Sequence, residues 1–140
     1  MAFSLDGFKD NWISTQLNVD AIDFAQQFGE HLCDLQDGKY GKTPGFAALT
    51  TSQIRNFFGE IKRIQAKTFD KQKSAFLLIR PKLAYAEARV LQKNKNSRIK
   101  DFRKIMERAH TQVQSDIHFQ NFVDFLEATL AYHKFYGGRD

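Results

Sequence analysis

Apolar residues recur at intervals of three and four along most of the chain, the spacing of one face of an α-helix. This pattern predicts a first helix over residues 19–35, followed by a loop at 36–45, where Gly, Pro and Asp accumulate. A second helix is predicted from Thr50 to about Phe69. Thr50 and Gln53 match the capping-box pattern, in which each side chain bonds the other residue's backbone amide.

A third helix is predicted over residues 74–93, although Pro81 lies inside it. Proline lacks a backbone N–H and disfavours helical geometry at the preceding residue, Arg80. We therefore expect either a kink, or one helix that ends near Ile79 and another that starts at Pro81. The polar stretch 93–97 ends this region.

A fourth helix is predicted over 98–114 and a fifth after the capping residues Ser115 and Asp116, ending at FYGG, residues 135–138. No alternation of apolar and polar residues persists beyond four positions, and no internal repeat occurs. The sequence therefore predicts an all-α fold, a compact bundle of about five helices.

The predicted helices fill most of the chain, and its length suits a single helical domain over 1–140. Residues 1–17 show no sustained periodicity, so we expect them to form a loosely attached arm. The first residues do not resemble a signal peptide, and no run of apolar residues is long enough to span a membrane. The one cysteine, Cys33, permits no internal disulfide, and together these features favour a cytoplasmic protein.

The net charge of +5 is unevenly distributed along the chain. Residues 50–108 carry 16 Lys and Arg against 5 Asp and Glu, whereas the segments on both sides are mildly acidic. A cationic segment attracts polyanions, and charge alone leaves nucleic acid, an acidic protein and an anionic membrane surface open as partners.

Catalytic and metal-binding patterns are weak. His31, Cys33 and Asp34 are close in sequence, but no second cluster completes a metal site, and Glu127 and His133 lack the Glu-x-x-His spacing of di-iron bundles. His133 and Cys33 lie on apolar helix faces, which favours structural positions in the core. We therefore expect no catalytic residue, no metal and no cofactor, and assign the aromatic last helix to the centre of the bundle or to an oligomer contact.

Basic residues form rows along the predicted helices. Arg55 and Lys62 form one row, and Lys82 and Arg89, with Tyr85 between them, form another that we place opposite the apolar face of its helix. Such rows neutralise successive phosphates without reading base sequence. Tyr85 either stacks on a base or packs on a neighbouring helix. A third group surrounds the fourth helix: Arg98, Lys100, Arg103, Lys104 and Arg108.

Three stretches carry a resemblance to a known family: LTTSQIRNFFGEIKR (49–63), IRPKLAYAEAR (79–89) and NFVDFLEATLAYHKFYGG (121–138). Together they resemble the small subunit of type III-A CRISPR effector complexes, the Csm family, whose function is antiviral defence. The resemblance implies a non-catalytic helical subunit of a ribonucleoprotein. Copies of it stack in a filament beside the backbone subunits that hold the guide RNA, facing the guide RNA–target RNA duplex.

The same resemblance implies that basic residues of the first two stretches contact the phosphate backbone of the target RNA. The stronger candidates are Arg55, Lys62, Arg63, Lys82 and Arg89, and the weaker ones are Arg80 and Tyr85. Two other functions remain open from the residues: a stand-alone nonspecific binder of single-stranded nucleic acid, and a purely structural scaffold that leaves these cations solvated.

Overall fold

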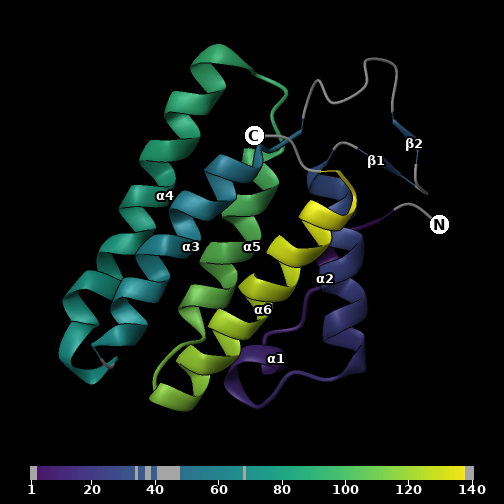
Figure 1. The fold of residues 1–140 in the computed structure, drawn as a ribbon. Coiled ribbons are helices and arrows are strands. Elements are labelled where there is room, and N and C mark those ends of the chain that lie inside the picture. The colour runs from purple at the N-terminus through teal and green to yellow at the C-terminus, as the bar shows by residue number, and fades with distance from the viewer. Residues whose placement is uncertain (1–2, 34, 37–38, 41–47, 68, 138–140) are drawn as a thin grey trace.

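The protein is a helical bundle in a computed structural model that describes residues 3–33, 35–36, 39–40, 48–67 and 69–137 (Figure 1). The described residues form six α-helices: α1 (Asn11–Ser14), α2 (Val19–Leu32), α3 (Thr51–Ala66), α4 (Lys73–Lys93), α5 (Ile99–Thr111) and α6 (Asp116–Phe135). The same residues also contain two 3₁₀ turns, Leu5–Gly7 and Asp70–Gln72. Two short strands, β1 (Leu35–Gln36) and β2 (Lys39–Tyr40), pair in antiparallel orientation. The predicted helical class is confirmed, while the described residues form six helices rather than about five, because the four-residue α1 precedes the five that were predicted.

The helix starts follow the capping residues of the sequence. Thr50 and Gln53 form the predicted capping box: the Gln53 amide donates to Thr50 Oγ1 at 3.2 Å, and the Thr50 amide donates to Gln53 Oε1 at 2.7 Å. Ser115 caps α6 by accepting the His118 amide. The first predicted helix ends at Leu32 rather than at residue 35, and Leu35 belongs to β1. Most of the predicted loop at 36–45 lies outside the described residues.

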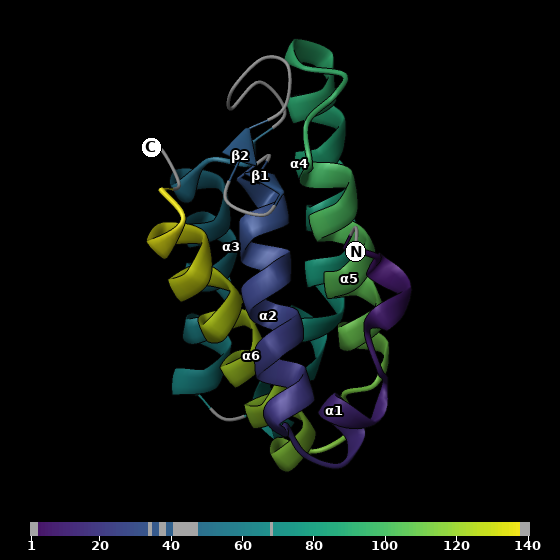
Figure 2. The ribbon, with the colours of Figure 1, turned by 90° about the vertical axis from the view of Figure 1, so that its right-hand side faces the viewer.

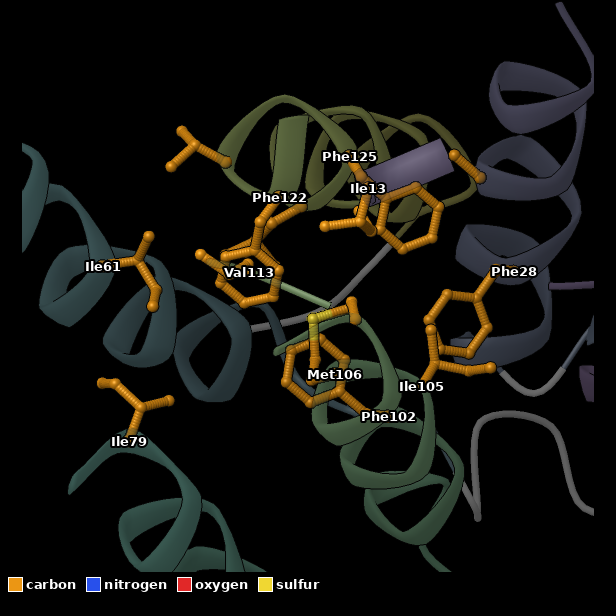
Figure 3. Packing of buried hydrophobic residues seen from close by; sticks show 14 of the residues in the cluster. Ile13, Phe28, Ile61, Ile79, Phe102, Ile105, Met106, Val113, Phe122 and Phe125 are labelled. Carbon is orange, nitrogen blue, oxygen red and sulfur yellow. The ribbon is translucent and has the colours of Figure 1, made fainter. Parts of the chain in front are cut away.

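Helix α6 packs against three other helices, α1, α2 and α3, and Figure 2 shows it beside α2. Its closest neighbour is α2, where Gly29 has no room for a side chain: a Cβ there would lie 2.7 Å from the His133 amide nitrogen. Figure 3 shows side chains from several helices meeting in one core, with Phe102 and Met106 of α5 among them. The prediction that the aromatic last helix packs within the bundle is confirmed by the buried rings of Phe122 and Phe125, while an oligomer contact of this helix stays a prediction.

The expectation of a loosely attached N-terminal arm is wrong for residues 8–13. Phe8, Trp12 and Ile13 are buried; the Trp12 ring lies 5.5 Å from that of Phe24 on α2. Asn121 of α6 donates a hydrogen bond to the Ile13 carbonyl at 2.9 Å. The segment is too short for a periodicity to be read from it, because α1 has only four residues.

Helix α4 lies at the edge of the bundle away from α2, where it packs against α3 and α5 (Figure 1). It continues through Pro81 as one helix, so the alternative of two helices meeting there is wrong. Pro81 deprives the Leu77 carbonyl of its helical donor, but Leu77 is 64% exposed and water can hydrate that carbonyl. The missing bond is therefore tolerated.

Candidate nucleic-acid interface

A groove of about 580 Å³ separates α3 from α4 along part of their length. Its apolar lining includes Phe57 of α3, Leu83, Ala86 and Val90 of α4, and Phe102 of α5. The groove is open to solvent at the edge of the bundle, where the positive segment of the chain lies. We therefore describe the positions of the predicted basic residues relative to this groove.

Three cations of α4 line this groove: Lys82, Arg89 and Lys93. The expectation that Lys82 and Arg89 lie opposite the apolar face is wrong. They follow Ile79 by three and ten residues, so at about 100° per residue they lie only about 60–80° from it around the helix. The two cations therefore border the apolar face and line the groove.

Glu60 of α3 pairs with two of the predicted residues: Lys82 of α4 across the groove, and Arg63 one turn further along α3. Lys82 Nζ lies 3.3 Å from Glu60 Oε2, and Arg63 Nη1 lies 2.8 Å from Glu60 Oε1. The Arg63 and Lys82 side chains are 76% and 57% exposed in these pairs. Exposed ion pairs contribute only about 0–1 kcal/mol, so a phosphate can replace the Glu60 carboxylate.

Arg55 and Lys62 belong to a different surface. Both are exposed, and they lie about 140–160° around α3 from Glu60. Lys62 Nζ donates to Gln65 Oε1 at 2.7 Å, and Gln65 in turn donates to Gln120 of α6 at 2.9 Å. The structure therefore separates the two predicted rows and places Arg55 and Lys62 toward α6 rather than on the groove.

Tyr85 and Arg80 complete the predicted set. Tyr85 is 65% exposed, so it does not pack on a neighbouring helix, and its ring centre lies 5.8 Å from the Arg89 guanidinium carbon. Arg80 is exposed on the side of α4 that faces α5, and its charge is one of the causes that lower the pKa of His110, after burial as the largest. Arg80 is thus not part of the groove.

The cations around α5 differ in whether they form ion pairs with other segments of the chain. Arg103 forms a partly buried pair with Glu87 of α4 at 3.0 Å, and Arg108 forms an exposed pair with Asp10 at 2.8 Å. Lys100 and Lys104 are exposed. Lys93 was not among the residues predicted from the sequence. It follows Lys82 by eleven residues, close to three helical turns, and this spacing could have placed it on the same side of the helix.

The histidine and cysteine on the predicted apolar faces are structural. His133 is fully buried and its Nε2 lies 2.6 Å from the Leu49 carbonyl oxygen, while Cys33 Sγ donates to the His133 carbonyl at 3.2 Å. Burial raises the pKa of the Cys33 thiol to about 11. In the described part of the chain, no three His, Cys, Asp or Glu side chains gather as metal ligands would.

The two buried histidines predict that stability decreases at acidic pH. Burial lowers the pKa of His133 and of His110, so the unfolded chain binds protons below about pH 6.5 that the folded chain does not. The free energy of unfolding should therefore be greatest above that pH and decrease as the pH falls through it. Thermal unfolding followed by circular dichroism between about pH 8 and about pH 5 measures this.

The variant His133→Ala isolates one of these groups. Its free energy of unfolding at neutral pH should be lower than that of the wild type by about 1–3 kcal/mol, because the Leu49 carbonyl loses its hydrogen-bond donor and the core loses a side chain. Its pH dependence should also be shallower than that of the wild type. Wild-type stability in this variant would contradict the structural assignment of His133.

The chain matches the model of a known protein family. The family described as Csm2 Type III-A matches residues 22–139, which include all but the first turn of α2 and the whole of α3 to α6. No curated protein matches the chain, and no solved structure matches it. No helix in the described residues is long and apolar enough to cross a membrane. Since the family match covers most of the chain, the chain belongs to the Csm2 Type III-A family, the small subunit of the type III-A CRISPR Csm complex.

Proposed function

We propose that this subunit contacts the phosphate backbone of the target RNA with the basic edge of α4. The observation that carries the proposal is the row of Lys82, Arg89 and Lys93 along the groove. Lys82 and Arg89 are seven residues apart, which is about 10.5 Å along the helix axis. Cations placed in this way neutralise phosphates of one strand as it passes along α4.

Contacts of this kind do not depend on base sequence. Lysine and arginine bound to phosphates position a nucleic acid, whereas base edges carry the sequence information. This suits a subunit of a complex in which a guide RNA specifies the target by pairing. We propose no catalytic step for this chain, which acts by holding the target strand.

Arg63, Arg55 and Lys62 extend the proposed interface around α3. Arg63 adjoins the groove through Glu60, while Arg55 and Lys62 contact a neighbouring segment of the guide–target duplex from the α6 side. Arg80 and Tyr85 are peripheral contacts, with Tyr85 available to stack because its ring is exposed.

Stacking of several copies is supported by exposed apolar side chains on opposite sides of the bundle. Leu77 and Leu78 of α4 are 64% and 55% exposed, and Val19 of α2 is 74% exposed. Figure 1 places α4 and α2 at opposite edges. Contacts between two different surfaces of the same protein generate an open filament when the rotation between copies does not close a ring.

The dependence of RNA binding on salt tests the proposal. For single strands, the logarithm of the affinity falls with the logarithm of the salt concentration by about 0.7 per phosphate neutralised. Three cations on one strand give a slope of about −2. Titration of fluorescent RNA with the full chain, alone and in the assembled complex, measures it. An affinity independent of salt, or strong preference for one RNA over its scrambled sequence, would contradict phosphate binding.

A further inference from the structure

We infer that the groove between α3 and α4 accepts one unstacked nucleotide of the bound RNA, with its base inside and its phosphates on the α4 edge. This inference rests on the proposed function, because the strand must first follow Lys82, Arg89 and Lys93. The groove volume of about 580 Å³ lies within the range of about 300–1,000 Å³ typical of small-ligand sites.

The apolar lining provides a surface on which a base can lie. Phe57 is half-buried, and its ring is held by an edge contact with Phe102, at 5.4 Å between centroids and 88° between planes. Ala86 and Val90 line the α4 side of the groove without filling it. Stacking on an aromatic ring is tolerant of base identity, because every base has a π-face.

Uncharged amides border the same groove. Asn56 is exposed, and Gln53 is fixed by its Oε1, which accepts the Thr50 amide at 2.7 Å. The Gln53 Nε2 and the Asn56 side chain have no hydrogen-bond partner among the described residues and line the groove. Amides of this kind donate to and accept from base edges.

The distribution of charge favours a nucleotide over an acidic helix of a protein partner. The lining cations all come from α4, while the α3 side carries Glu60 and the two amides. An acidic segment lying in the groove would meet the Glu60 carboxylate. A nucleotide places its phosphates on the cationic side and its uncharged base toward Phe57.

A comparison of two RNA probes tests this inference on the unmodified full chain. One probe is a short oligouridylate, whose bases stack weakly on one another, and the other is an abasic ribose–phosphate chain of the same length. We expect the abasic chain to bind about tenfold more weakly, because it keeps every phosphate but has no base for the groove. Equal affinities would overturn the inference.

A matched pair of variants locates the base. Ala86→Phe fills the groove, whereas Ala84→Phe adds the same ring to an exposed position about 160° around α4. We expect Ala86→Phe to bind oligouridylate about tenfold more weakly and the abasic chain normally, and Ala84→Phe to bind both as the wild type does. If Ala86→Phe binds RNA normally but no longer joins the other Csm subunits, the groove holds a protein segment and the inference is wrong.

The two proposals fail in different ways. If phosphate binding itself is wrong, both probes bind without salt dependence. If only the nucleotide site is wrong, both probes bind equally and with the same steep salt dependence. Should Ala86→Phe not fold, the comparison of probes on the wild-type chain still decides the question.

Discussion

The double variant Lys82→Glu, Arg89→Glu is expected to bind target RNA about tenfold more weakly or worse, and to melt close to the wild-type temperature. Each reversal replaces a phosphate contact with repulsion of a phosphate. Folding should tolerate both changes. Lys82 is 57% exposed in its pair with Glu60, and Arg89 is exposed beside Tyr85, contacts that contribute about 1 kcal/mol or less each.

A reversal with the same change in net charge provides the control. Lys100→Glu with Lys104→Glu lies on the exposed face of α5, outside the groove, and should weaken RNA binding much less. Glu87→Lys is unsuitable because Glu87 pairs with Arg103 at 3.0 Å and its loss would disturb the packing of α4 on α5. Gel-shift titration of the reconstituted complex at fixed salt measures both. If the groove variant binds as the wild type does, the row is solvated surface and the scaffold function is favoured.

The corresponding variant Arg55→Glu, Lys62→Glu reports on the second surface. Because these residues lie away from the groove, their effect should be independent of that of the first pair, so that losses in the combined variant add. The RNA affinity of this variant therefore distinguishes an RNA strand that contacts only α4 from an interface that continues around α3.

Trp12→Ala is expected to reduce the free energy of unfolding by about 3–5 kcal/mol, the usual loss for a large buried aromatic side chain. Trp12 is 2% exposed and lies among the rings of Phe8 and Phe24, at 5.5 Å from each between centroids. A cavity at this position would loosen the segment before α2 from the core. Urea unfolding followed by circular dichroism measures the loss.

Asn11→Ala, at an exposed position of the same short helix, serves as the control and should change the stability by less than about 1 kcal/mol. If Trp12→Ala were no worse than this control, residues 8–13 would be an arm after all, and the burial of Trp12 would contribute nothing to folding.

Much of the secondary structure could be read from local signals. Thr50 and Ser115 cap helices where predicted, since capping depends on residues within one turn. The buried positions of α3, including Ile54 and Ile61, follow the 3.6-residue period. The same period failed for α4, which has exposed apolar residues such as Leu77 as well as buried ones, so its buried side could not be found by periodicity alone.

The candidate site was predicted only in part, because periodicity did not locate the buried side of α4. The basic residues and their helices were identified, but the positions of Lys82 and Arg89 relative to the core, and the separation of Arg55 and Lys62 from them, were not. The helices that pack beside α3 and α4 decide which of their cations share a surface. Spacing along the sequence does not show which helices these are.

The sequence by itself determined the helical class, the charge of the middle segment and the family, because these depend on composition, local spacing and motifs. Only the tertiary structure decided that Phe8 and Trp12 are core, that Glu60 joins cations of α3 and α4, and that a groove lies beside them. Contacts between residues distant in sequence form only when the apolar faces of all the helices are buried together, and that packing is a property of the whole chain.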